Sequence, residues 1–169
     1  KMVLFVDTKM QAKEADKTAA LATGMPYVSE KWMGGTMTNF GVIKKMIKRY
    51  RDLTEDRDAG KLTKYTKKER LEIDREIARL EIKVGGLTGL NRLPDAIFIW
   101  DIKVEKTALT EAKKKNVPII AICDTNVNPT GVNYVIPSND DASKTIKLVL
   151  DAVVEAINEG KAKKGNSEK

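Results

Sequence analysis

Hydrophobic residues along this chain fall into short continuous runs that are separated by longer amphipathic stretches. Such runs are typical of strands buried on both faces of a parallel sheet. They occur at residues 3–6, near 27–29, and at 96–101, 119–123 and 134–136. Capping and turn residues delimit helices between them, at about 9–23, 104–115 and 139–158, with Gly160 predicted to end the last helix. The alternation predicts an α/β domain with helices on both faces of a parallel sheet.

Residues 36–84, which we call the arm, interrupt this alternation with two charged amphipathic stretches joined by a polar turn. Gly34-Gly35 and Gly85-Gly86 flank the arm, so it is predicted to be inserted into the α/β domain. Two helices of about 17 residues would project about 25 Å. The apolar residues of the first helix share one half of its surface, and they are Phe40, Ile43, Met46, Ile47, Tyr50 and Leu53. Those of the second helix recur at the spacing of a coiled-coil seam, and they are Ile73, Ile77, Leu80 and Val84.

Local capping residues predict where the two arm helices begin. Thr38 or Asn39 suits the cap of the first helix, and Thr66 with Glu69 forms a capping-box pattern before the second. The fold expected from these patterns is therefore an α/β domain with an inserted, protruding α-helical coiled-coil hairpin. We expect three parts, which are the α/β domain over residues 1–35 and 85–160, the arm over 36–84, and a basic disordered tail over 161–169.

Positive charge is concentrated in the arm. The chain of 169 residues has a net charge of +7, and residues 36–84 hold 14 Lys and Arg against 9 Asp and Glu. Five of the seven surplus charges therefore lie in the arm, which predicts a polyanionic partner. The alternative is a solvated helix surface with pairs such as Glu72 with Arg75 and Glu76 with Arg79, each contributing only tenths of a kcal/mol.

Composition disfavours most enzymatic and membrane functions. The chain has no histidine, which removes the commonest general base, transition-metal ligand and partner of a nucleophile. The single cysteine, Cys123, lies in an apolar run and is expected to be a buried, inert thiol. No run of eighteen apolar residues is present, so we expect no membrane-spanning segment. No glycine-rich phosphate loop follows a predicted strand.

Three aspartates form the one constellation that suggests an active site. Asp7, Asp101 and Asp124 each follow the last apolar residues of a predicted strand, and ligands bind at the carboxyl ends of strands in open α/β sheets. Together they would hold Mg²⁺ for phosphoryl transfer or accept a phosphoryl group. The alternative is that each aspartate caps the helix or turn that follows its strand, which we favour.

Several motifs, taken in order, resemble the bacterial-type small-subunit ribosomal protein two family. They are residues 32–40, the arm, 93–96 running on to Asp101, Glu111, 116–118, 124–126, Pro129, Gly131 and 135–141. The resemblance implies a flavodoxin-like domain with a protruding coiled coil in the small ribosomal subunit. It also implies contacts to small-subunit rRNA and neighbouring ribosomal proteins, and the docking of ribosomal protein one. Members of the family carry a longer front segment with the first strand and helix of the domain, which this chain is expected to lack.

We therefore expect a non-enzymatic structural protein of the small ribosomal subunit that supports translation, in a cytoplasmic or an organellar ribosome, without a cofactor or metal. Phosphate contacts by arm cations should provide RNA binding, because A-form RNA hides its major-groove base edges. A rival hypothesis is that the arm docks a protein helix instead. Trp32 and Trp100 are expected mainly in the core, although Trp32 lies at the arm's base. The predicted RNA contacts are Lys44, Lys45, Lys48, Arg49, Arg51, Lys64, Lys67, Lys68, Arg75, Arg79 and Lys83, with Trp32, Asn39 and Arg92 as weaker candidates.

Overall fold

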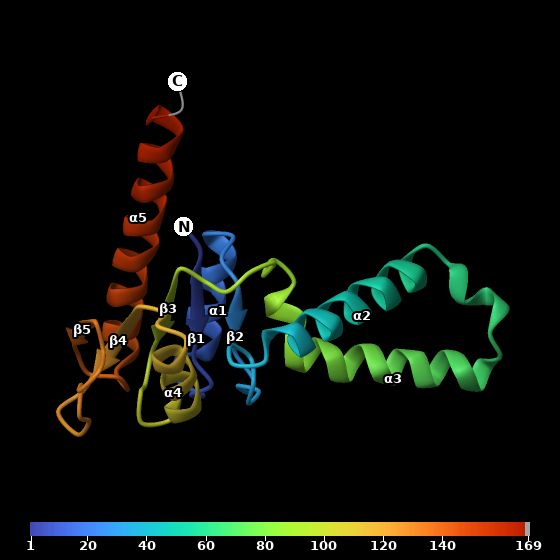
Figure 1. Ribbon diagram of the computed structural model, residues 1–169, viewed down its shortest axis with the longest axis horizontal. Coiled ribbons are helices and arrows are strands. Elements are labelled where there is room, and N and C mark those ends of the chain that lie inside the picture. Colours follow the sequence, from blue (N-terminus) through green and yellow to red (C-terminus); the bar gives the residue numbers. More distant parts are fainter. Residues whose placement is uncertain (168–169) are drawn as a thin grey trace.

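The computed structural model describes residues 1–167, with side chains to residue 163, and contains a five-stranded sheet (Figure 1). All pairings are parallel and the strand order is β2-β1-β3-β4-β5. This arrangement confirms the predicted α/β class and is consistent with a flavodoxin-like fold. The strands are β1 (Val3–Val6), β2 (Tyr27–Val28), β3 (Ala96–Ile99), β4 (Ile119–Cys123) and β5 (Tyr134–Pro137).

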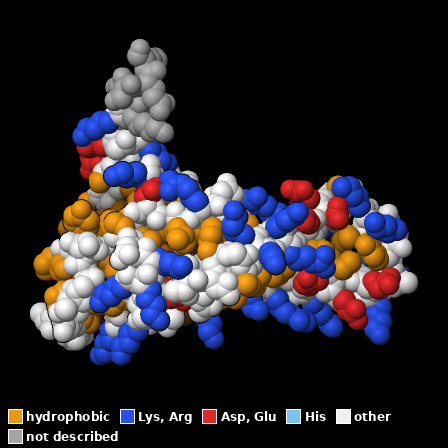
Figure 2. Space-filling model, in the orientation of Figure 1, with side chains coloured by type: hydrophobic (Ala, Val, Ile, Leu, Met, Phe, Trp, Pro, Cys, Tyr) orange, Lys and Arg blue, Asp and Glu red, His pale blue; other side chains and the backbone are white. Residues whose placement is uncertain are grey.

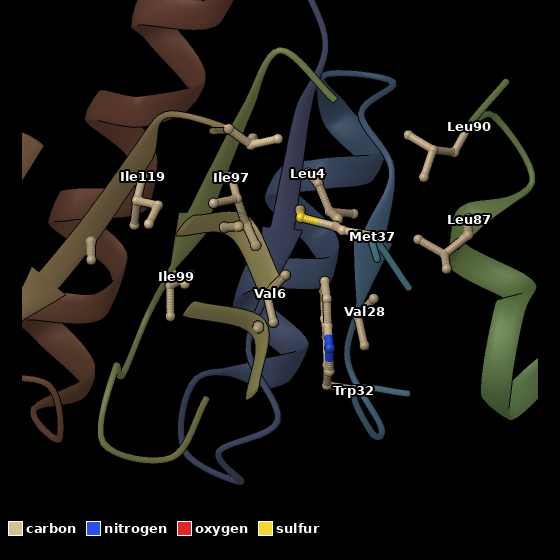
Figure 3. Close-up of a cluster of buried hydrophobic side chains, with 14 of the residues drawn as sticks. Leu4, Val6, Val28, Trp32, Met37, Leu87, Leu90, Ile97, Ile99 and Ile119 are labelled. Atoms are coloured by element: carbon tan, nitrogen blue, oxygen red, sulfur yellow. The ribbon is translucent and has the colours of Figure 1, made fainter. Parts of the chain in front are cut away.

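Helices cover both faces of the sheet. Alternate residues of the central strands point to opposite sides, so each face is apolar and is buried under helices. Phe5 and Phe98 pack in one cluster with residues of α1 (Lys13–Ala22) and α5 (Ser143–Ser167). On the other face, Leu4, Val6, Ile97 and Ile99 pack with α4 (Lys106–Lys114) and with the segments that lead into and out of the arm (Figure 3). The central strands β1, β3 and β4 are therefore buried on both sides, as their continuous apolar runs predicted, whereas the edge strand β5 is mostly exposed and its predicted burial is wrong.

Two helices of the arm lie side by side and project from the β2 edge of the sheet (Figure 1). They are α2 (Phe40–Asp58) and α3 (Lys67–Val84), joined through the short helix η1 (Lys61–Lys64). Ile43, Ile47 and Leu53 are buried on α2, and Ile77 and Val84 are buried on α3. The predicted apolar stripes thus face inward. A second short helix, η2 (Gly85–Leu87), returns the chain to the part that contains the sheet, which we call the body.

The predicted capping box at the start of α3 is present. The Thr66 hydroxyl accepts a hydrogen bond from the Glu69 amide at 3.3 Å, and the Glu69 carboxylate accepts one from the Thr66 amide at 2.8 Å. The start of this helix is therefore encoded locally. By contrast, Asn39 occupies the N-cap position of α2, as one of the two predicted candidates, but its side chain makes no cap bond there.

Thr66→Ala is expected to lower the free energy of unfolding by about 1 kcal/mol, because it leaves an amide of the first turn of α3 without its acceptor. Urea denaturation would measure the change. Thr63→Ala, an exposed threonine in η1, is the matched control and should leave the midpoint nearly unchanged. Equal effects of the two substitutions would contradict the role of the capping box.

Both outer helices of the body differ from their predicted bounds. The helix α1 begins at Lys13 because the Asp7 carboxylate binds the Lys9 amide at 2.9 Å and residues 10–12 form a turn. The helix α5 continues through Gly160 to Ser167, where a stop at Gly160 and a tail from residue 161 were predicted. Lys161 on this extension donates to the carbonyl of Thr23, just after α1. Residues 168–169 of the predicted tail lie outside the described residues.

Candidate nucleic-acid interface

Cations of α2 border a groove at the base of the arm. Lys44, Lys45, Lys48 and Arg51 are exposed and line it together with Leu90 and Asn91 from the segment after η2, and its volume is about 480 Å³. Figure 2 shows Lys and Arg side chains along the arm. Asp52 and Glu55 also border the groove, and the guanidinium of Arg51 donates to the carbonyl of Thr88. Four of the predicted contact residues are thus brought together on one surface.

The remaining arm cations are distributed over the turn and α3. Lys64, Lys67, Lys68, Arg75, Arg79 and Lys83 are all exposed. Lys64 places its ammonium 5.3 Å from the ring centroid of Tyr65, a cation–π contact. Lys83 borders a separate hollow with Tyr27 and Tyr50, where the arm meets the sheet edge. The predicted residues therefore form more than one surface.

Two of the predicted arginines already bind carboxylates. Arg49 holds Glu76 across the helix pair with bonds of 2.9 and 3.0 Å, and this hydrogen bonding lowers the pKa of Glu76. Glu76 was expected to pair with Arg79. Arg92 makes two 2.8 Å bonds to Asp95, which lowers the pKa of that carboxyl to about 2 together with the Met2 amide. A phosphate would have to compete with these partners.

Trp32 and Asn39 occupy very different positions at the base of the arm. Trp32 is only 7% exposed, and its indole N–H donates to Glu111 at 3.2 Å. It lies within the cluster of apolar side chains on the face of the sheet that α4 covers (Figure 3). This burial corrects its inclusion among the RNA contacts, because its ring is not offered to a base. Asn39 is exposed and open to a partner.

The three aspartates at the carboxyl edge of the sheet accept backbone hydrogen bonds from the residues that follow their strands. Asp101 accepts the Lys103 amide at 2.7 Å, and Asp124 accepts the Thr125 amide at 2.6 Å, as Asp7 does that of Lys9. These bonds match the capping alternative. Among residues 1–167 no group of three or more carboxylate or thiol side chains is arranged to hold a metal ion.

Lys9 occupies the space between carboxylates at this edge. Its ammonium lies 3.5 Å from Asp101, 3.0 Å from Asp140 and 2.6 Å from Asp141. These ion pairs tie the loop before α5 to the ends of β1 and β3. The edge is thus held together by internal ion pairs, which gives no support to a phosphoryl-transfer site.

The family model described as ribosomal protein S2 matches residues 1–160 of this chain. The chain belongs to the ribosomal protein S2 family. As a member of the S2 family it is a structural, ribosome-associated protein of the small subunit that works in translation. Family membership also disfavours the phosphoryl-transfer alternative. In the described part of this S2 family chain, no helix has the length and apolar character needed to cross a bilayer.

Sequence reasoning did not predict the burial of three acidic side chains in this S2 family chain. Glu111 of α4 is 6% exposed and binds the segment that enters the arm. Asp7 and Asp16 are each 1% exposed, and each has one oxygen without a hydrogen-bond partner among the described residues. For the two residues on helices a signal existed in the sequence, because Glu111 adjoins Ala112 and Asp16 lies one turn after Ala12, and both alanines are small apolar residues.

Proposed function

We propose that the arm of this S2 family chain is a coiled-coil hairpin that binds small-subunit rRNA through its phosphates. The observation that carries the proposal is the groove where Lys44, Lys45, Lys48 and Arg51 converge. Four cations on one surface can follow a phosphate backbone, and such contacts dominate the affinity of proteins for nucleic acids. Shape would be recognised rather than base sequence, because the major groove of A-form RNA is too narrow for side chains.

The contacts divide into a primary set and a secondary set. The groove cations form the primary set. The secondary set surrounds the turn and α3, and it consists of Lys64, Lys67, Lys68, Arg75, Arg79 and Lys83. Arg49, Arg92 and Asn39 stay in the proposal as peripheral contacts, the two arginines after exchange of their carboxylate partners. Trp32 is left out because of its burial.

The rest of the molecule would hold the arm against the ribosome. We assign residues 1–35 and 85–160 to an α/β domain that contacts neighbouring ribosomal proteins and supports the docking of ribosomal protein one, in a cytoplasmic ribosome. A second candidate function is docking of a protein helix on the outer face of α3. It is favoured by Leu71 and Ile82, which lie on one line of that helix and are 50% and 58% exposed.

Reversing the groove charges with Lys44→Glu, Lys48→Glu and Arg51→Glu is expected to abolish tight rRNA binding without unfolding the chain. Three lost phosphate contacts should reduce the slope of log K against log salt by about 2 to 3. Filter binding of small-subunit rRNA across a salt series measures this slope, and circular dichroism checks the fold.

The matched control reverses three exposed lysines of the body, Lys103, Lys144 and Lys147. It makes the same change in net charge, so a similar loss in both variants would show that only overall charge matters. An unchanged slope in the groove variant would contradict the contact assignment. Leu71→Gln with Ile82→Gln keeps every cation and separates the second candidate, because it should impair a protein partner and leave rRNA binding intact.

A further inference from the structure

The arm is joined to the body at two roots that are built in different ways. At one root, residues 85–90 return from α3 with Leu87 and Leu90 buried among the apolar residues of the sheet. This root is held by apolar packing. At the other root, residues 32–38 lead from β2 into α2, and their polar groups converge on a single side chain, Glu111 of α4.

Both carboxylate oxygens of Glu111 are occupied by donors from this entry segment. Oε1 accepts the Gly35 amide at 2.7 Å and the Trp32 indole N–H at 3.2 Å. Oε2 accepts the Met37 amide at 2.9 Å, the Thr38 amide at 3.0 Å and the Thr38 hydroxyl at 3.1 Å. Five donors thus meet one carboxylate, and hydrogen bonds to a charged acceptor are the stronger kind.

Glu111 is itself fixed to the sheet. Its neighbours Ala108 and Ala112 on α4 are fully buried in the same cluster that contains Trp32 and Met37. Burial raises the pKa of Glu111, but hydrogen bonds from the entry segment outweigh it and hold the pKa below its usual value. The carboxylate therefore stays ionised at neutral pH and stays in place.

We propose that Glu111 is a positioning residue that sets the direction of the arm relative to the sheet. Only Asn39 separates its last donor, Thr38, from the first residue of α2. The helix has 19 residues, and at about 1.5 Å per residue a tilt of about 10° at its root displaces the far end by about 5 Å. Such a displacement exceeds the tolerance of a phosphate contact. This consequence for RNA rests on the proposed function, whereas the effect on direction does not.

The test is Glu111→Gln. Glutamine keeps one carbonyl acceptor but places an NH₂ donor against the donors of the entry segment. Pulsed electron resonance between spin labels at Lys64→Cys and Lys144→Cys, in a Cys123→Ala background, reports the distance from the arm's turn to the body. We expect the distance distribution to widen by about 5 Å. We also expect the amides of Gly35, Met37 and Thr38 to exchange hydrogen at least about tenfold faster.

Glu105→Gln is the matched control on the same face of the body. Glu105 is 4% exposed and immediately precedes α4, but its carboxylate binds the Thr8 amide at 3.2 Å rather than the entry segment. It should leave the distance distribution unchanged. Widening in this control as well would overturn the proposal, because loosening of α4 in general would then explain the effect.

The remaining outcomes separate this inference from the proposed function. A folded Glu111→Gln variant with the original distance distribution overturns the positioning role. A widened distribution with unchanged rRNA affinity supports the positioning role and contradicts the proposed RNA contacts. If Glu111→Gln does not fold, Thr38→Val decides, because it removes only the 3.1 Å hydroxyl bond. It should widen the distribution less than about 5 Å, and an unchanged width overturns the proposal.

Discussion

Gly86→Ala is expected to lower the free energy of unfolding by about 3 kcal/mol, at the upper end of the usual cost of overpacking. A Cβ at this position would lie 2.8 Å from Cδ2 and Cε2 of the Tyr27 ring and closer still to the Tyr27 carbonyl oxygen. A ring can turn away, but a carbonyl of β2 cannot move without disturbing its pairing with β1. The substitution therefore strains both the sheet edge and one root of the arm.

Urea denaturation with the midpoint and slope fitted separately measures this loss. Gly89→Ala, three residues along the same connection, is the matched control because nothing lies within 4 Å of a Cβ built there. It should change stability by less than about 0.5 kcal/mol. Equal midpoints for the two variants would mean that Gly86 does not approach Tyr27 as closely as described.

The elements that the sequence predicted correctly are those whose signals are local. Each strand is a continuous apolar run, and the start of α3 is determined by Thr66 and Glu69 alone. The helix α5 was predicted too short because Gly160 was expected to end it, whereas the helix continues past this glycine and Lys161 donates to the distant carbonyl of Thr23. A glycine in a helical pattern weakens the helix by only about 1 kcal/mol, and such a contact can offset that cost.

The exposure of the candidate contact residues was predictable, but their ion pairs were not. The sequence places basic residues on the arm. In the structure those of α2 and α3 are exposed, and Arg49 among them also forms an ion pair with Glu76. The sequence could not show that Arg49 binds Glu76 of the other helix, because residues 27 apart meet only after the helices pack. It also could not show the bond from Trp32 to Glu111, which lies 79 residues away, although it placed Trp32 mainly in the core, where the structure has it. The RNA contacts and the coiled-coil packing stay predictions.

Asp7 and Asp16 are expected to make the fold less stable as pH rises, which is the reverse of ordinary acid denaturation. Burial, the main cause, raises the pKa of Asp7 from 3.8 to about 7, with Glu105 and Asp101 adding to the effect and the Lys9 amide and ammonium opposing it. Burial and the neighbouring Asp7 raise the pKa of Asp16 as well. Well below pH 3.8 both carboxyls are protonated in the folded and unfolded chains, so neither affects stability.

Above that pH the unfolded chain releases these protons while the folded chain retains them, and stability falls until the pH passes the folded pKa. For Asp7 alone the loss between pH 4 and pH 8 is about 4 kcal/mol. Asp7→Asn removes the ionisable carboxyl group and keeps a side-chain oxygen that can accept the hydrogen bond from the Lys9 amide. It should therefore lie within about 0.5 kcal/mol of the original chain at pH 4 and exceed its stability by up to about 4 kcal/mol at pH 8. Asp16→Asn should act in the same direction.

Urea denaturation of each variant between pH 4 and pH 8 measures the difference, and Asp95→Asn provides a control of opposite sign. Arg92 and the Met2 amide lower the pKa of Asp95 to about 2, so its carboxylate stabilises the fold at neutral pH and loses that effect only as pH falls from 3.8 toward 2. Asp95→Asn should therefore be less stable than the original chain over the whole range. If Asp7→Asn and the original chain stay parallel from pH 4 to pH 8, the Asp7 carboxyl ionises normally in the folded protein, and its burial does not hold the proton.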